Sequence, residues 1–104
     1  MSTIAEIVST MQQKFNPSAA EELDLIFQFE VEDEDSFHLI VREGKLEVNR
    51  GDNNEANVTL KMNSDTLDGM ITGKTDGMQA FMTGELQASG DMMLATKLTQ
   101  LFPV

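Results

Sequence analysis

The strongest constraint on the fold is a change of hydrophobic period along the chain. Residues 3–15 place apolar side chains at helical spacing, and residues 25–62 then alternate apolar and polar side chains in four short segments. A period of two is typical of strands with one buried face. After Met62 the helical spacing returns. We therefore predict a sheet that is preceded and followed by helices.

Four segments carry the alternating pattern, and a fifth, shorter one follows later in the chain. We predict strands at residues 25–31, 37–42, 46–50, 56–62 and 86–90. An acidic cluster, residues 32–35, and the pair Glu43-Gly44 separate the first three segments as short turns. Strands joined by such turns form an antiparallel meander, and the polar half of the alternation predicts that one sheet face meets water.

The helical segments lie at both ends of the chain and between the fourth and fifth strands. The predicted helices are residues 3–15, 18–23, 64–73, 76–84 and 91–102. Gly73 and Gly84 stand where C-terminal caps are expected, and Asp76 and Asp91 stand where helices begin. We predict one α+β domain over residues 1–104, with a five-stranded, mostly antiparallel sheet and helices packed on one face.

Acidic side chains greatly outnumber basic ones. Eighteen Asp and Glu residues against seven Lys and Arg give a formal charge of −11. This charge repels phosphates and anionic lipid, so we expect no nucleic-acid partner and no docking through a basic patch. The chain has no cysteine, which excludes thiolate zinc sites and thiol nucleophiles. No apolar run approaches the about 20 residues of a membrane-spanning helix, so we expect no stable membrane insertion and a cytoplasmic location.

Three local patterns suggest chemistry, and each has a simpler explanation. Gly73-Lys74-Thr75 ends like a phosphate-binding loop, but that loop needs a glycine where this chain has Asp68. The acidic stretches around Asp33 and Asp52 lack the EF-hand spacing, which favours solvated turns. His38 has no Ser, Cys or second His nearby, and we expect it on the polar sheet face. We predict no catalytic residue, no metal and no cofactor.

Methionine is concentrated in the second half of the chain. Six of the eight methionines lie between residues 62 and 93. Methionine fills irregular gaps in ordinary cores, yet a flexible, polarisable lining also suits a cavity for apolar ligands of variable shape. Periodicity does not distinguish a core from a cavity here.

A series of short motifs connects this second half to a known family. Gly73-Lys74 ends one helix, Ala80-Phe81-Met82-Thr83-Gly84 forms the next, and Gly90-Asp91 precedes Ala95-Thr96-Lys97-Leu98. In this order the motifs resemble those of the sterol carrier protein type 2 domain family. The similarity extends back to the segment from Asn16-Pro17 to Phe29, so it covers nearly the whole chain.

The resemblance implies a fold in which the sheet and the helices enclose an apolar tunnel. It also implies non-enzymatic binding and intracellular transfer of lipids such as fatty acids, fatty acyl-CoA or sterols. By position, the residues implied to bind lipid are Met70, Ile71, Met78, Phe81, Met82, Met93, Leu94, Leu98 and Leu101.

The same resemblance implies an alternative function. The domain would then be an interaction or accessory module for enzymes of lipid or quinone biosynthesis, with such an enzyme as its partner. The family's better-known eukaryotic members are basic, whereas this chain carries a charge of −11. That charge disfavours acyl-CoA as a ligand, because the phosphates of acyl-CoA would meet a repulsive field.

Overall fold

The computed structural model describes residues 4–95 and 97–103. Its elements are α1 (Ile4–Lys14), α2 (Pro17–Ala20), β1 (Asp24–Val31), β2 (Phe37–Arg42), β3 (Lys45–Arg50), β4 (Val58–Met62), α3 (Ser64–Thr72), α4 (Gly77–Thr83), β5 (Gln87–Gly90), α5 (Met92–Ala95) and α6 (Leu98–Leu101). This order confirms the predicted sequence of elements with one difference. The helix predicted over residues 91–102 is two short ones, α5 and α6.

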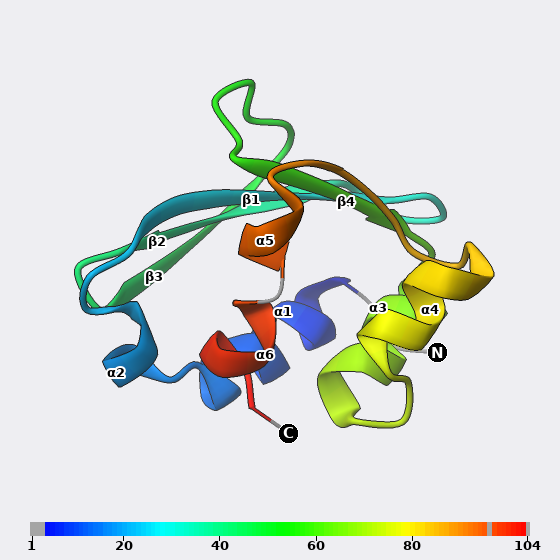
Figure 1. Ribbon diagram of the computed structural model, residues 1–104, viewed down its shortest axis with the longest axis horizontal. Helices are drawn as coiled ribbons and strands as arrows, with labels where there is room; N and C mark the ends of the chain where they lie inside the picture. The colour runs from blue at the N-terminus through cyan, green and yellow to red at the C-terminus, as the bar shows by residue number, and fades with distance from the viewer. Residues whose placement is uncertain (1–3, 96, 104) are drawn as a thin grey trace.

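The sheet has the strand order β3-β2-β1-β4-β5 (Figure 1). β1, β2 and β3 form the predicted antiparallel meander, and β4 pairs antiparallel with β5. β1 and β4 pair in parallel, with Phe29 opposite Leu60. The segment 51–57 makes this pairing possible, since Asn57 donates its N–H to the Ile26 carbonyl and accepts the Ile26 N–H through its side chain. The sheet is therefore mixed, and three of its four pairings are antiparallel.

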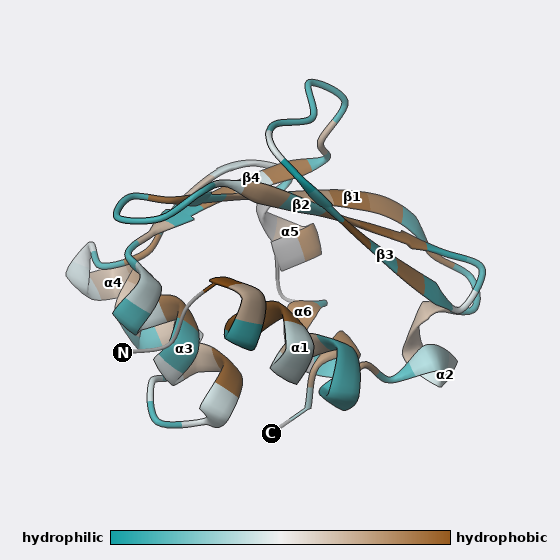
Figure 2. Cartoon of the chain, turned by 180° about the vertical axis from the view of Figure 1, so that it is seen from behind, coloured by the Kyte–Doolittle hydropathy of each residue, from teal (hydrophilic) through white to brown (hydrophobic). Residues whose placement is uncertain are grey.

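All helices cover one face of the sheet, so the molecule has two layers (Figure 1). Figure 2 shows the same arrangement from behind, with β1 coloured largely as hydrophobic. Phe27, Phe29 and Val31 point from β1 into the space between the layers and are buried. This is the face that the alternation predicted. The α+β class and the one-sided helices are confirmed.

Side-chain caps set where several helices begin and end. Asp76 caps α4 by accepting the Met78 N–H, and Gly73 and Gly84 end α3 and α4 with left-handed backbone, as predicted. The sequence favours Ser64 or Asp65 as the cap of α3, but Asn63 is the cap and accepts the Thr66 N–H. Asn16 similarly caps α2, which covers Pro17–Ala20 and so starts one residue earlier and ends three residues earlier than predicted.

Ser64 has a different role at the start of α3. Its backbone N–H and its hydroxyl both donate to the Asp33 carboxylate, at 2.8 and 2.6 Å. These two hydrogen bonds lower the pKa of Asp33 below its ordinary value. They join the turn after β1 to the first turn of α3, which follows the strand paired with β1.

The outer face of the sheet is only partly wet, which corrects the expectation of one solvated face. Gln28 and His38 point outward but are buried, because the loop after β3 lies over them. The Gln28 amide donates to the Gly51 carbonyl and accepts the Asn53 N–H at 2.7 Å. His38 Nδ1 donates to the same Gly51 carbonyl at 3.1 Å. His38 is thus a structural residue that holds this loop on the sheet.

Candidate functional site

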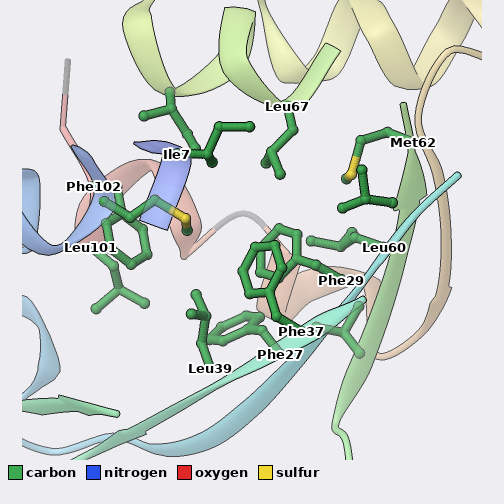
Figure 3. Packing of buried hydrophobic residues seen from close by; sticks show 14 of the residues in the cluster. Ile7, Phe27, Phe29, Phe37, Leu39, Leu60, Met62, Leu67, Leu101 and Phe102 are labelled. Carbon is green, nitrogen blue, oxygen red and sulfur yellow. The ribbon is translucent and has the colours of Figure 1, made fainter. Parts of the chain in front are cut away.

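A cavity of about 320 Å³, partly open to solvent, lies in the helical layer and reaches Phe29 on the inner face of the sheet. Its wall is formed by Met11, Phe29, Leu67, Met70, Ile71, Gly73, Thr75, Asp76, Gly77, Leu98 and Phe102. The apolar members come from α1, β1, α3, α6 and the segment after α6. Figure 3 shows two of them close by, with Leu67 pointing down from α3 toward the ring of Phe29.

Local sequence patterns explain why α1, β1 and α3 present these side chains to the cavity. Phe29 belongs to the inward half of the β1 alternation. Leu67, Met70 and Ile71 are spaced by three and four residues, so they share one face of α3. Met11 lies on the buried stripe of α1. Elements far apart in the sequence therefore meet around one apolar space.

The C-terminal segment is fixed to the rest of the cavity wall by backbone and ring contacts. The Leu101 carbonyl accepts the Asn16 N–H at 2.8 Å. The rings of Phe102 and Phe15 lie 5.9 Å apart between centroids, within the usual range for an aromatic pair. These contacts hold α6 and Phe102 against the end of α1, and so place Leu98 and Phe102 in the wall.

The loop from Gly73 to Gly77 forms part of the cavity wall and folds back onto α3. The Thr75 N–H donates to the Gly69 carbonyl at 3.0 Å. A side chain on Gly69 would overlap the Thr75 hydroxyl, so glycine is what allows this close approach. Gly73 supplies the left-handed backbone that reverses the chain. The glycines of this segment are therefore part of how the cavity is built.

The same loop supplies the polar side chains of the wall. Thr75 is half-buried, and its hydroxyl has no hydrogen-bond partner among the residues that the structure describes. One oxygen of Asp76 accepts the Met78 N–H at 3.0 Å as the cap of α4. The cavity is thus apolar along most of its wall and polar at this loop.

The structure places the nine residues implied by the family resemblance in three different settings. Met70, Ile71 and Leu98 line the cavity. Leu94 is half-buried against the core, and Leu101 is fully buried within it. The other four have large exposed fractions, which are 61% for Met78, 41% for Phe81, 78% for Met82 and 79% for Met93. Three of the nine thus come together at the cavity.

The sequence reasoning missed four apolar wall residues, which are Met11, Phe29, Leu67 and Phe102. Each of them belongs to a hydrophobic pattern that the sequence shows clearly. Those patterns identify a buried face, but they do not say whether the face meets another side chain or an open space. The sequence showed Thr75 only as part of a phosphate-loop-like pattern and Asp76 only as a helix cap, so neither was predicted to line a cavity.

The described part of the chain has no group of metal ligands, no histidine at the cavity and no membrane-spanning helix. Within residues 4–95 and 97–103, no three His, Cys, Asp or Glu side chains are grouped as metal ligands. His38 lies on the outer sheet face, on the side opposite the cavity. No described helix is both long enough and apolar enough to cross a bilayer.

Comparison with known proteins identifies the fold. A family model described as the SCP-2 sterol transfer family matches residues 6–103. Hydroxysteroid dehydrogenase-like protein 2 from Xenopus tropicalis is 33% identical over 103 residues, which are 96% of this chain and 25% of that protein. The stereoselective inverting sec-alkylsulfatase Pisa1 from Pseudomonas sp. superposes with a TM-score of 0.80 at 26% identity, over 88% of this chain and 15% of that one.

A solved sterol carrier protein domain is also similar. The solution structure of the sterol carrier protein domain 2 of Helicoverpa armigera superposes with a TM-score of 0.74 at 24% identity, over 91% of this chain and 84% of that one. The chain spans only about a quarter of the Xenopus relative, so that protein's activity is not carried over. Because the family model matches nearly all of the described residues, the chain belongs to the SCP-2 sterol transfer family.

Proposed function

We propose that this domain binds the hydrocarbon part of a lipid in the cavity and transfers the lipid without reacting it. The observation that carries the proposal is the cavity itself. Its volume of about 320 Å³ is at the lower end of the range of small-molecule sites. Membership of a sterol transfer family supports the same function. In this proposal Met70, Ile71 and Leu98 contact the lipid, together with the apolar residues beside them in the wall.

The cavity volume sets the length of chain that fits. A methylene group is close in size to a water molecule, which occupies about 30 Å³, so the cavity holds roughly ten methylenes. Burying them at about 0.8 kcal/mol each contributes about 8 kcal/mol, which corresponds to micromolar affinity before the costs of association are subtracted and is therefore an upper limit on the affinity. We therefore expect ten-carbon chains to fit fully and longer chains to extend out of the cavity.

The residues of the cavity wall support the transfer of a lipid rather than an enzymatic reaction on it. Among the residues that the structure describes, Thr75 and Asp76 are the only polar side chains of the wall, and His38, the one histidine of the chain, lies on the opposite face of the sheet. A nucleophile in a hydrolase or transferase needs a base within hydrogen-bond reach. The described wall contains no such pair.

A matched pair of variants tests the binding site. Met70→Trp places a large ring in the cavity wall, whereas Met82→Trp adds the same ring at an exposed position on α4. We expect saturable binding of the uncharged fluorophore N-phenyl-1-naphthylamine to the wild type and to Met82→Trp, with displacement by 1-decanol. Met70→Trp should bind the fluorophore at least about tenfold more weakly.

Two results would contradict the proposal. One is the absence of displaceable binding for fatty alcohol, fatty acid and sterol alike. The other is equal binding by the two tryptophan variants, which would move the ligand away from the cavity. If the wild type binds the fluorophore as expected, mass spectrometry of lipid extracted from freshly purified protein would identify the natural ligand.

A second candidate function is favoured by the small share of each longer relative that this chain matches. The matched segment is 25% of the Xenopus dehydrogenase-like protein and 15% of the sulfatase chain, so this fold occurs within longer chains that are named as enzymes or enzyme-like proteins. The domain would then present lipid to a lipid-metabolising enzyme. A stable complex with such an enzyme would support this function, whereas copurified lipid without a protein partner favours simple transfer.

A further inference from the structure

Two parts of the cavity wall differ in chemistry, and the difference bears on which lipid head group fits. The described wall residues from α1, β1, α3 and α6 are apolar, and the polar side chains among the described wall residues lie on the loop from Gly73 to Gly77. A lipid with one polar end gains most when its tail meets the apolar wall and its head meets this loop, because an unpaired buried polar group is costly.

We propose that this loop is the head-group end of the cavity and that it selects an uncharged, hydrogen-bond-donating head over a carboxylate. The inference rests on the proposed function, since it assumes that a lipid occupies the cavity. A primary alcohol is the simplest head of this class. Its O–H group donates to Asp76, and its oxygen accepts a hydrogen bond from the Thr75 hydroxyl.

The first argument concerns Asp76. It is one of the residues that line the cavity, it is exposed at the cavity's open side, and one oxygen of its carboxylate already accepts the Met78 N–H. The Met78 N–H is therefore already bonded, and it is not available as a donor to the carboxylate of a ligand. The second oxygen of Asp76 is an acceptor, so it attracts an O–H donor and repels a second carboxylate.

The second argument concerns basic side chains. No lysine, arginine or histidine contributes to the described wall. Lys74 lies between Gly73 and Thr75 in the sequence, but its side chain is exposed and is not part of the wall. The chain as a whole carries a formal charge of −11, which adds to the repulsion of an anionic head.

The third argument concerns Thr75. Thr75 is a half-buried residue of the wall, and no described residue bonds to its hydroxyl. A hydroxyl is both a donor and an acceptor, so it can pair with an alcohol head without any change of charge. The close packing of Thr75 on Gly69 holds that hydroxyl at a fixed place on the loop.

The test compares 1-decanol with decanoate, which share a ten-carbon chain and differ in head-group charge at neutral pH. Any apolar cavity binds neutral 1-decanol more tightly than decanoate. The informative quantity is therefore the ratio of the 1-decanol affinity to the decanoate affinity, and how this ratio changes when Asp76 is replaced. We expect Asp76→Asn to reduce the ratio of alcohol to acid affinity about tenfold. Asparagine is also a good helix cap, so the start of α4 is retained.

Asp91→Asn is the matched control. Asp91 also accepts a backbone N–H at the start of a short helix, from Met93 at 3.1 Å, but it is not in the cavity wall. This control removes the same charge and preserves the same kind of cap, so the ratio should change by less than about twofold. Thr75→Val provides a second variant, and it should weaken 1-decanol binding about fivefold while decanoate binding changes little.

The outcomes separate this inference from the proposed function. If neither ligand displaces N-phenyl-1-naphthylamine from the wild type, both fail. If both ligands bind but Asp76→Asn and Asp91→Asn shift the ratio equally, the head-group assignment fails and lipid binding stands. The assignment also fails if the wild type prefers decanoate, or if Lys74→Gln weakens decanoate binding, because Lys74 would then pair with an anionic head.

Discussion

Replacing Gly69 by alanine tests how closely the Gly73–Gly77 loop packs on α3. A Cβ atom at this position would lie 3.1 Å from the Thr75 Cβ and would overlap the Thr75 hydroxyl. Thr75 is β-branched and therefore stiff about χ1, and its N–H is bonded to the Gly69 carbonyl. The side chain cannot move away without the loop. The substitution therefore strains the wall of the cavity.

Two opposing contributions set the size of the effect. Overpacking of this kind costs about 1–3 kcal/mol, whereas replacing glycine by alanine in a helix interior gains about 1 kcal/mol. We expect a net loss of between about 0 and 2 kcal/mol of unfolding free energy. In a Thr75→Gly background the clashing atoms are absent, so Gly69→Ala should stabilise the fold by up to about 1 kcal/mol. The coupling between the two positions is then about 1–3 kcal/mol.

Urea unfolding followed by far-ultraviolet circular dichroism measures this coupling, because the chain has no tryptophan or tyrosine to serve as an intrinsic probe. The four proteins of the cycle are the wild type, Gly69→Ala, Thr75→Gly and the double variant. Equal stabilisation by Gly69→Ala in both backgrounds would refute the reasoning, since it would mean that the loop does not press on α3.

Three further predictions concern the core, the pH and the net charge. Leu101→Ala should lower the unfolding free energy by about 2–5 kcal/mol, because Leu101 is fully buried, whereas Met82→Ala at an exposed position should change it by less than about 0.5 kcal/mol; urea unfolding checks both. Asp33→Asn should lose the stability that the Ser64 hydrogen bonds provide. Because the pKa of Asp33 is lowered in the folded state, this stability is fully present above the ordinary aspartate pKa of about 4 and is lost as the pH falls through the lower folded value. The difference in unfolding free energy between wild type and variant should therefore shrink in acid, and a constant difference would contradict the assignment. With a charge of −11, the melting temperature should rise from low to near-molar salt as repulsion is screened, and a flat or falling curve would mean that the charges are locally compensated.

Local patterns were enough to predict the elements but not their full arrangement. The alternation of Phe27 and Phe29 with Gln28 predicts both the strand and its buried face, because neighbouring side chains on a strand point in opposite directions. The parallel pairing of β1 with β4 depends on contacts between Ile26 and Asn57, 31 positions apart. No local pattern encodes such a contact. The burial of Gln28 likewise depends on a loop that crosses from the edge of the sheet.

The cavity was the least predictable feature for a related physical reason. A hydrophobic stripe has the same spacing whether it meets the core, an open space or solvent. Leu101 and Met82 were both implied to contact lipid by the resemblance, yet one is fully buried and the other is 78% exposed. Most of the described cavity wall comes from the half of the chain that carries the family motifs, whereas Met11 and Phe29 lie far from those motifs in the sequence.

The order of the strands leaves β3 and β5 as the two outer strands of the sheet. Unpaired backbone groups on an outer strand can recruit a strand from another molecule and begin aggregation. β5 has only four residues, and β3 carries exposed charges at Lys45, Glu47 and Arg50. Short length on one side and charged side chains on the other both oppose the growth of the sheet from molecule to molecule. The two open edges are therefore poor templates for pairing with another molecule.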